Sequence, residues 1–454
     1  MKGPLVTTQV NHHDTHGAAA ATSDPLRPVI HPRPEAGWLN DPNGLLRHDG
    51  RYHVFCQYNP ESARHHRISW AHLSSADLVS WREHPVAISP DDDAGDAFGC
   101  WSGVATVDAG TPTLVYTGVR QDGGASAVLL ARSSDSELNA WEKAPAPATG
   151  MPRGESFTDV RDPFLFTFAG RRYALQGAGS RGGDPALLLY DAEDLTSWRY
   201  LGRFLDTGDG VAREWAEAEI WECPQLVELD GRWVLLLSLW RWVDDRHRLE
   251  SVAYLVGDIE TDEAGTLLRF APTAGGRADT GPDFYAPQAL AEEDRTLMWG
   301  WSWEGRAETY ADAAGWAGVL TLPRTLGLEA ERLVVAPAPE LAALRGSRAT
   351  LEPGPVHVVS DPAEIAVAGA VAAGAEIEVL LVSEAGERPV LAIAAEGARV
   401  FIDRSIVEAF RGGSVSHTVR AYPEAGEEWA VRVTGAVADA WALETMSVEY
   451  RVSD

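Results

Sequence analysis

Three carboxylic acids lie at closely related places in similar segments of the sequence. Asp41, Asp162 and Glu222 lie nine, eight and nine residues before a Gly-Arg pair that opens an apolar run. A proline follows each acid directly or after one residue, and proline favours extended backbone in the residue before it. Hydrolysis of a glycosidic bond needs two carboxyl groups in different environments, one to attack and one to protonate the leaving oxygen. A third, ionised carboxylate can bind hydroxyl groups and stabilise a cationic transition state.

The acids have two other interpretations. The stretch GWLNDPNGL, from Gly37 to Leu45, is rich in turn-forming residues, so Asp41 taken alone indicates a turn. Three acids can also bind calcium through their oxygen atoms. No tightly spaced acidic loop accompanies them, and the acidic run Asp91–Asp93 is typical of a solvated loop. We therefore predict neither a metal site nor a cofactor.

The elements that must position the acids follow a repeat of about 60 residues. Because a strand averages about five to six residues, such a unit holds four strands and their loops. We predict an all-β chain in which residues 31–335 form a five-bladed β-propeller, since radial repetition leaves only short strand edges. A solenoid of stacked β-coils is the alternative. The repeat is marked by Gly50, Gly110, Gly170 and Gly231 before apolar strands, and by Trp81, Trp141 and Trp198 in a second element.

The remainder of the chain divides into three regions. Residues 1–30 lack the apolar core of a secretion signal and are predicted to form a flexible tail. Residues 336–348 indicate a Pro-rich linker with a short helix. Residues 349–454 contain short alternating segments with regular turns, which predict a C-terminal β-sandwich.

Charge and cysteine content restrict the partners and the location. The net charge of −29 argues against binding of nucleic acid or anionic membranes, and no apolar run is long enough to cross a membrane. The three cysteines, Cys56, Cys100 and Cys223, cannot all pair and show no zinc spacing. We predict a cytoplasmic protein whose partner is a small-molecule or oligosaccharide substrate. The sequence makes no prediction of oligomeric state.

A propeller would bring acids from distant segments together. Equivalent positions on the innermost strands converge around the central channel, so the three acids would lie at one of its mouths. The corresponding place holds Trp101 and Ser102 in the second repeat and falls near Tyr285 in the fifth. Flat aromatic faces beside carboxylates suit the binding of a sugar ring.

Seven short motifs, in order along the chain, resemble those of glycoside hydrolase family 32. The resemblance extends from about Trp38 to the C-terminal region, and the family contains invertases, sucrose-6-phosphate hydrolases, inulinases and levanases. It implies a five-bladed β-propeller followed by a β-sandwich, in agreement with the repeat. It also implies a retaining β-fructofuranosidase. The motifs are WLNDPNG, FCQYNP, CWSG, RDP, ECPQL, DFYAPQ and FIDRSIVEAF.

The resemblance also implies roles for individual residues. Asp41 would attack the anomeric carbon of a β-fructofuranosyl unit, and Glu222 would act as general acid and then as base. Asp162, with Arg161 beside it, would bind fructose hydroxyl groups and stabilise the transition state. The pocket lining is implied to comprise Asn40, Gln57, Trp101 and Ser102, with Tyr285 and Trp303 as weaker candidates beside Trp301 and Trp316.

The chain departs from the family pattern in the segment after QYNP. Members of the family usually have a tryptophan here, and this sequence has His65 in the corresponding place. The substitution removes part of the apolar wall that the family places around fructose. Arg64 and Arg67 nearby are candidates for binding a phosphate or an additional sugar, although arginines on such a loop are commonly solvated.

The predicted activity is the release of terminal β-D-fructofuranosyl units from sucrose or short fructooligosaccharides. A fructosyltransferase and a sucrose-6-phosphate hydrolase are alternatives within the same fold. A non-catalytic fructan-binding protein is the alternative of another class, but it would normally lack one of the three acids. A site at the narrow mouth of a channel further predicts exo cleavage, with one terminal fructose released at a time.

Overall fold

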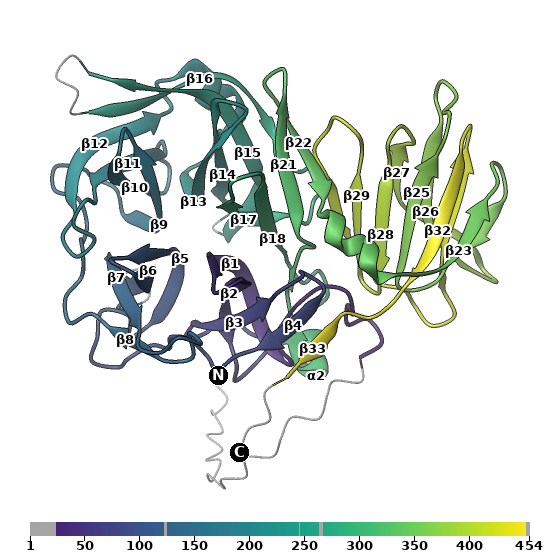
Figure 1. Ribbon diagram of the computed structural model, residues 1–454, viewed down its shortest axis with the longest axis horizontal. Coiled ribbons are helices and arrows are strands. Elements are labelled where there is room, and N and C mark those ends of the chain that lie inside the picture. The colour runs from purple at the N-terminus through teal and green to yellow at the C-terminus, as the bar shows by residue number, and fades with distance from the viewer. Residues whose placement is uncertain (1–23, 122–124, 245, 263–266, 451–454) are drawn as a thin grey trace, which may run out of the picture.

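The computed structural model describes residues 24–121, 125–244, 246–262 and 267–450, and this part of the chain is all-β. Most of the tail predicted for residues 1–30 lies outside the described residues. The helices within them are short: α1 (Gly210–Trp215), α2 (Glu308–Ala314) and the 3-10 helix η1 (Pro339–Leu344). Figure 1 shows two regions side by side, a round array of sheets that ends with β22 and a stack of strands from the C-terminal part of the chain.

The round array consists of antiparallel units of four strands, each running through neighbouring strands in chain order. The third and fourth units are joined by one residue pair, Gly179 with Ile220. In the first unit, β19 (Trp316–Ala317) pairs in parallel with β1, and in the fifth, β20 (Val319–Leu320) pairs with β18. The units comprise β1 (Gly37–His48), β2 (Arg51–Asn59), β3 (Ser69–Ser75) and β4 (Ser80–Glu83); β5 (Gly99–Asp108), β6 (Thr111–Val119), β7 (Ser126–Ser133) and β8 (Trp141–Lys143); β9 (Asp159–Phe168), β10 (Arg171–Gly179), β11 (Ala186–Asp191) and β12 (Arg199–Asp206); β13 (Ile220–Leu229), β14 (Arg232–Val243), β15 (Arg246–Thr261) and β16 (Leu268–Arg277); and β17 (Tyr285–Ala291), β18 (Thr296–Ser302), β21 (Arg324–Glu329) and β22 (Arg332–Pro337).

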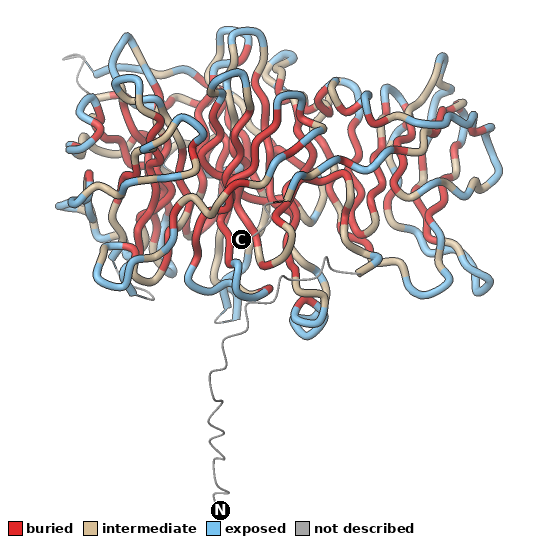
Figure 2. Tube along the Cα trace, turned by 60° about the horizontal axis from the view of Figure 1, so that its bottom comes forward, coloured by how far each residue is buried: buried red, intermediate tan, exposed pale blue. Residues whose placement is uncertain are grey.

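The first strands of the five units, β1, β5, β9, β13 and β17, face a common centre (Figure 1). A pocket of about 350 Å³ is lined by residues from all five of these strands and by Trp233. Figure 2 shows that buried backbone is concentrated in this centre, whereas exposed residues lie on the peripheral loops. The five strands therefore surround one axis.

Each of these first strands has a bulge in its ladder to the second strand of the same unit. Regular pairing is interrupted beside Leu39, Trp101, Arg161, Glu222 and Tyr285, and one or two residues are left unpaired at each interruption. Three of the bulges contain a proline, which has no N–H to donate to the ladder. The residues before these prolines, Asp162, Cys223 and Ala286, have positive φ angles of 59°, 45° and 45°.

Hydrogen bonds between neighbouring units hold the bulges in place. Gln288 of β17 connects two other units, because its Oε1 accepts from the Leu45 N–H at 2.7 Å and its Nε2 donates to the Gly103 carbonyl at 2.8 Å. Three more links join consecutive units at the bulges: Asp162 N–H to Thr117 Oγ1 at 2.8 Å, Cys223 N–H to Asp162 Oδ2 at 2.9 Å and Ala286 N–H to Ser238 Oγ at 3.1 Å.

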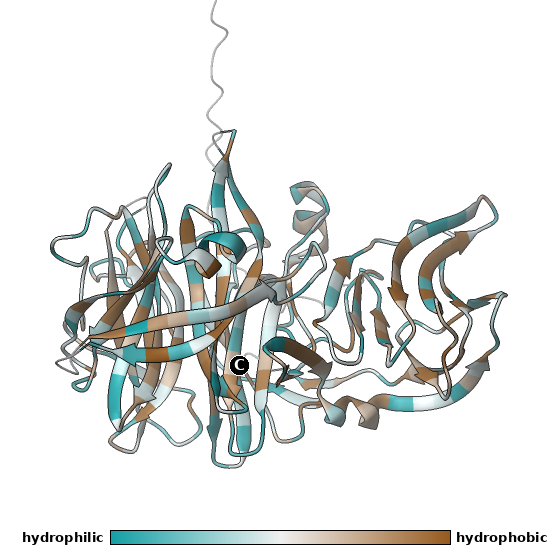
Figure 3. Ribbon diagram, turned by 90° about the horizontal axis from the view of Figure 1, so that it is seen from above, coloured by the Kyte–Doolittle hydropathy of each residue, from teal (hydrophilic) through white to brown (hydrophobic). Residues whose placement is uncertain are grey.

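Two antiparallel sheets form the C-terminal region, and their strands contain many hydrophobic residues (Figure 3), of which a buried set from both sheets forms one core cluster. Their orders are β23-β32-β25-β28-β29-β30 and β24-β31-β26-β27. The first sheet begins at Arg345, four residues before the predicted start of the sandwich. The strands are β23 (Arg345–Leu351), β24 (Val356–Val358), β25 (Ala363–Ala368), β26 (Glu376–Ser383), β27 (Gly386–Ala394), β28 (Arg399–Asp403), β29 (Ile406–Phe410), β30 (His417–Arg420), β31 (Glu428–Thr434) and β32 (Val437–Leu443).

The final strand, β33 (Ser447–Glu449), differs from the sequence prediction, which assigned it to the sandwich. It pairs in parallel with β4 of the first unit, and Figure 1 shows it beside that strand, away from the two C-terminal sheets. The alternating residues of this segment predict a strand but do not specify its partner. The free edge of β4 provides that partner.

A buried ionic cluster joins the two regions. Arg324 of β21 donates to Glu408 of β29 at 2.7 Å and 3.1 Å, and to Asp279 at 3.0 Å. His31 contacts Asp403 at 2.7 Å and Glu408 at 3.0 Å through its two ring nitrogens. Each of these buried charges has a partner of opposite sign, as burial of charge requires.

Candidate active site

The bulges place the predicted site residues around the axis. Arg161, Glu222 and Tyr285 share one register, since each is the last paired residue before a bulge, whereas Asp162 is the first unpaired residue of its own bulge. Asp41 is the second unpaired residue of the bulge in β1. The sequence placed the three acids in one equivalent position, and the structure corrects this to neighbouring positions. They still meet because a bulge redirects the side chains of adjacent residues.

Asp41 is buried and surrounded by donors. Its Oδ2 accepts a hydrogen bond from Ser102 Oγ at 2.6 Å and one from Gln57 Nε2 at 3.1 Å. Gln57 Nε2 also contacts Ser102 Oγ. Two residues on neighbouring units therefore fix the orientation of the Asp41 carboxylate.

Asp162 is connected to Asp41 through Cys223. The Cys223 thiol lies 3.5 Å from Oδ2 of Asp41 and 3.5 Å from Oδ2 of Asp162. Burial raises the pKa of this thiol, so it remains protonated and can donate. Since Glu222 precedes Cys223 in the chain, the three acids lie within one small region.

Glu222 is held at both carboxylate oxygens. Arg161 Nε donates to Oε1 at 2.8 Å, and the Tyr285 hydroxyl donates to Oε2 at 2.7 Å. Arg161 also donates to Asp159 at 2.8 Å. The side chain of Glu222 is 13% exposed, so it can contact a ligand from the mouth of the site.

The acids perturb one another. Burial raises the pKa of Asp41 to about 7; the charges of Asp162 and Glu222 act in the same direction, and the hydrogen bond from Ser102 opposes them. Burial and the charge of Glu222 raise the pKa of Asp162 to about 6, against the effect of Arg161. Carboxyl groups with shifted pKa values in a common cleft are typical of catalytic sites.

Aromatic side chains surround the acids. Trp303 lies 6.3 Å from the Tyr285 ring and 5.9 Å from the Trp301 ring, measured between centroids. Trp301 in turn packs against Trp38 at 6.1 Å. Trp316, in contrast, is fully buried beneath the guanidinium of Arg33 at 4.3 Å. Of the weaker candidates, Trp303 and Trp301 are therefore close to the site, and Trp316 has a packing role.

His65 lies at the aromatic rim. Its ring meets the edge of Trp38 at 4.9 Å and that of Trp101 at 6.3 Å. Thus His65 occupies a place between two aromatic walls. The neighbouring arginines are engaged elsewhere: Arg64 pairs with Glu308 and with Asp312 at 2.6 Å, and Arg67 pairs with Asp92 at 2.7 Å.

Several polar atoms at the site are buried and have no hydrogen-bond partner among the described residues. They include an acceptor, Asn40 Oδ1, and two donors, Nε1 of Trp101 and Nε1 of Trp301. Buried polar groups normally have partners, so these atoms favour a ligand with many hydroxyl groups. A set of carboxylates, aromatic faces and unpaired polar atoms can bind a sugar and cleave a glycosidic bond.

Sequence reasoning missed three residues near the acids. Cys223 contacts two of them, Trp38 forms part of the aromatic rim, and Trp240 lies 5.7 Å from the Arg161 guanidinium. Trp38 and Cys223 belong to the motifs WLNDPNG and ECPQL, but no role in the site was predicted for either residue. Trp240 belongs to no motif that we used, so only the strand pairing places it near Glu222.

Comparison with known proteins identifies the class. A family model described as "Glycosyl hydrolases family 32 N-terminal domain" matches residues 31–337. The chain is 34% identical over 336 residues to a sucrose-6-phosphate hydrolase of Bacillus subtilis, covering 72% of this chain and 68% of that protein. It is 32% identical over 422 residues to a sucrose-6-phosphate hydrolase of Klebsiella pneumoniae, covering 87% and 88% of the two chains.

The structural comparison agrees with this assignment. A β-fructofuranosidase of Bombyx mori superposes with a TM-score of 0.78 at 26% identity, covering 95% of this chain and 96% of the other. A fructan 1-exohydrolase of Cichorium intybus superposes with a TM-score of 0.77 at 22% identity, which shows a shared fold. The chain belongs to glycoside hydrolase family 32, as the motifs indicated. It is a glycosidase of the β-fructofuranosidase type.

Other predictions concern metals, membranes and cysteines. Within the described ranges, no helix is long and apolar enough to cross a membrane, and no group of three or more His, Cys, Asp and Glu side chains is arranged to hold a metal ion. Cys56, Cys100 and Cys223 are free and buried. The cytoplasmic location and the absence of a cofactor stay predictions.

Proposed function

We propose that the protein releases terminal β-D-fructofuranosyl units from sucrose or short fructooligosaccharides by a two-step retaining mechanism. The observation that carries the proposal is the contact network of Asp41, Asp162 and Glu222 at the mouth formed by five convergent strands. Asp41 is proposed as the nucleophile, Glu222 as the acid and base, and Asp162 as the residue that binds fructose hydroxyl groups.

We propose that the five units are the blades of a β-propeller and that the C-terminal sheets form a β-sandwich. The convergence of the first strands on one pocket supports the radial arrangement. The pairing of β19 with β1 supports closure of the ring between the last unit and the first. A solenoid would not bring its first and last units into contact.

In the first step, ionised Asp41 attacks the anomeric carbon of fructose, and the bond to the leaving oxygen breaks. Glu222 gives its proton to that oxygen. In the second step, Glu222 takes a proton from water, and the hydroxide formed displaces Asp41 from the anomeric carbon. The hydrogen bonds of Ser102 and Gln57 hold Asp41 in position before attack, and Arg161 and Tyr285 orient Glu222.

The pocket is proposed to hold one fructose ring. Asn40, Gln57, Trp101 and Ser102 would line it together with Arg161, Tyr285 and Trp303. Their closeness to the three acids supports this assignment. The ring of acids and aromatics around one axis favours entry of a chain end, and hence exo cleavage.

A second candidate function is hydrolysis of sucrose 6-phosphate. The similarity to two sucrose-6-phosphate hydrolases favours it. Arg64 and Arg67 are the arginines that the sequence offered as phosphate ligands. Both are paired with carboxylates, which argues against this role.

Parallel product analysis with sucrose, sucrose 6-phosphate, kestose, inulin and levan tests the proposal. We expect free fructose to be the first product from each substrate that is cleaved, and short substrates to react faster than polymers. A ladder of oligomers preceding fructose would contradict the exo mode. Binding of these substrates without any turnover would support a fructan-binding protein instead. Transfer of fructosyl units to a sugar acceptor, even at low substrate concentration, would support a fructosyltransferase.

A further inference from the structure

Arg33 lies far below the surface without a hydrogen-bonding partner. Arg33 is only 2% exposed. Its Nε, Nη1 and Nη2 atoms form no hydrogen bond within the described part of the chain. One face of the guanidinium packs on Trp316 at 4.3 Å. A guanidinium has five N–H donors that need acceptors in its own plane, and a stacked ring satisfies none of them.

The other buried arginines of the described chain show how unusual this is. Arg324 donates to two carboxylates, Arg161 donates to Glu222 and Asp159, and Arg420 donates to Ser405 and to the Trp303 carbonyl. A buried charge without a compensating partner is strongly destabilising. A bound anion would therefore stabilise the folded protein by pairing with Arg33.

Arg33 lines a pocket of about 460 Å³ formed by the segment before β1, the turn between β28 and β29, and the segment around β33. Three arginines, Arg27, Arg33 and Arg404, contribute to its wall, together with His31 and Tyr450. The one acid in the wall is Asp24, which accepts from Arg306 and from the Trp316 indole at 3.0 Å each. Arg404 also pairs with Asp361 at 3.4 Å, but the wall still holds more cations than acids on a chain with a net charge of −29.

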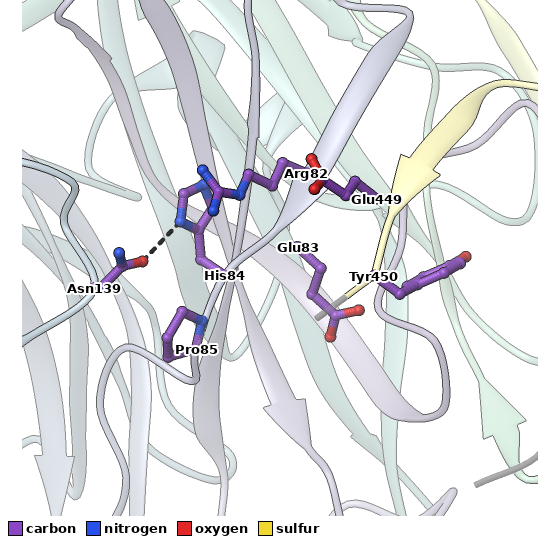
Figure 4. Close-up of a pocket in the computed structure, with 7 residues that line it drawn as sticks. All are labelled: Arg82, Glu83, His84, Pro85, Asn139, Glu449 and Tyr450. Atoms are coloured by element: carbon purple, nitrogen blue, oxygen red, sulfur yellow. Dashed lines mark hydrogen bonds between the residues drawn. The ribbon is translucent and has the colours of Figure 1, made fainter. Parts of the chain in front are cut away.

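An alternative partner for Arg33 is Glu83. The positive charge of Arg33 attracts the carboxylate of Glu83, but Arg33 makes no hydrogen bond to Glu83. Glu83 accepts instead from the Glu35 N–H at 3.3 Å and lines the adjoining pocket with Tyr450 and Arg82 (Figure 4). Burial raises the pKa of Glu83 to about 7, so at neutral pH it carries only part of a negative charge.

We propose that the pocket lined by Arg27, Arg33 and Arg404 binds a phosphoryl group, as inorganic phosphate or as a phosphate ester. Tetrahedral oxyanions present several acceptors to a guanidinium fork and carry the charge that this site needs. Burial together with the charge of Arg27 lowers the pKa of Arg33 to about 9, and a bound anion reverses that effect. The site is separate from the three catalytic acids, and its existence does not depend on the proposed reaction.

Its position suggests what binding would do. Trp316 pairs with Gly37 at the start of β1, the strand that carries Asp41. An anion that holds Arg33 against Trp316 would stabilise this closure of the ring. We expect a stabilising ligand and not a second catalytic centre.

Thermal unfolding and isothermal titration calorimetry of the full chain test the proposal. Inorganic phosphate at constant ionic strength should raise the Tm by about 2 °C or more and bind with a stoichiometry near one. Glucose 6-phosphate and glucose form the second arm. A response to both phosphate and glucose 6-phosphate supports a phosphoryl site open to either source, and a response to the ester alone supports a phosphate-ester site.

Arg33→Met removes the charge but keeps the length of the side chain. It should abolish the response and, in phosphate-free buffer, be at least as stable as the wild type. Arg199→Met, at a solvent-exposed arginine paired with Asp191, is the matched control and should keep the response. If Arg33→Met does not fold, Arg33→Lys should bind phosphate about tenfold or more weakly. No response in the wild type, or an equal response in an Arg33 variant, would overturn the proposal.

Discussion

Of the three acids at the site, Asp41 has the largest number of donors around it, and this supports its proposed role. Three neighbours, Ser102, Gln57 and Cys223, direct a polar hydrogen toward the same oxygen, Oδ2. The other carboxylate oxygen, Oδ1, is left available to contact a ligand. Glu222 differs, because both of its oxygens are already held by Arg161 and Tyr285. This difference supports the proposal that Asp41 attacks and that Glu222 exchanges a proton while keeping its orientation.

The first prediction concerns these two acids. Asp41→Asn and Glu222→Gln should each lower kcat/KM by roughly 10²–10⁴ or more, because each removes one of the two carboxyl functions. Steady-state kinetics with sucrose, together with thermal unfolding, measure activity and fold separately. A folded variant with wild-type turnover would refute the role of that residue.

The second prediction concerns pH. The pKa of Asp41 is about 7 because burial and two neighbouring acids raise it, and only the ionised form can attack. Activity should therefore fall as the pH drops through about 7. Ser102→Ala removes a hydrogen bond that lowers this pKa, so the acid limb of the kcat/KM profile should move to higher pH. An unchanged limb in a folded, active Ser102→Ala enzyme would show that another group controls it.

The same shift determines how Asp41 affects stability. Its pKa is higher in the folded protein than in the unfolded chain, where it is about 3.9. The folded state therefore binds more protons between about pH 4 and pH 7, and its stability falls as the pH rises through this window. Asp41 thus costs stability at neutral pH, which is expected of a residue kept for function.

At the residue level, the sequence predicted which side chains meet but not their exact register. Spacing from the turn glycines brought Asp162 and Glu222 to within one position of each other. The remaining difference depends on the positive φ angles of Asp162 and Cys223. Since positive φ is uncommon in any residue other than glycine, the sequence did not indicate it at these two positions.

The bulge is the element that builds the site, and each first strand has one beside the site, while β1 has a second between Asn43 and Leu46. Proline explains three of the bulges, because it cannot donate to the ladder. In β5 the bulge contains Ser102 and no proline, so the sequence contained no sign of it. The pairing of β33 with β4 was equally hidden, because an alternating pattern identifies a strand and not its neighbour.

The third prediction concerns the bulge in β5. Gly103 follows Ser102, donates its N–H to Asn43 Oδ1 at 3.1 Å and accepts from Gln288. A Cβ atom at this position would lie 2.0 Å from the Val115 carbonyl oxygen. Gly103→Ala should therefore displace Ser102, reduce activity more than tenfold and lower the Tm.

Gly327→Ala is the matched control for this prediction. Gly327 also lies in a strand, but a Cβ atom there meets no atom within 4 Å. Activity assays and thermal unfolding of the two variants give the comparison. Equal behaviour of Gly103→Ala and Gly327→Ala would mean that the bulge tolerates a side chain and does not depend on glycine.

At the scale of the whole molecule, the two regions are locked together by charge as well as by apolar contact. Phe401 and Phe410 of the C-terminal sheets share a buried cluster with Leu333 of β22. Arg324 lies between Glu408 and Asp279 with none of its side chain exposed. The sequence predicted two regions from a change of pattern. It gave no sign of this cluster, because Arg324 is 45 positions from Asp279 and 84 positions from Glu408.

The fourth prediction concerns that junction. Arg324→Met should destabilise the protein by about 3–5 kcal/mol, because it removes the buried cation that Glu408 and Asp279 share. Arg388→Met, at an exposed arginine paired with Glu427, should cost about 1 kcal/mol or less. Denaturant unfolding of both variants measures the difference. Similar losses for the two would show that the buried cluster contributes little to stability.

The fifth and most direct test follows the stereochemistry at the anomeric carbon. The central claim is that Asp41 forms a covalent intermediate which water or an alcohol then displaces with the help of Glu222. Two displacements restore the original configuration. When the wild-type enzyme cleaves sucrose in a methanol–water mixture, early NMR spectra should show methyl β-D-fructofuranoside as the first-formed methyl glycoside. If the α-anomer is formed first, a single displacement has occurred and the account of Asp41 as the nucleophile is wrong.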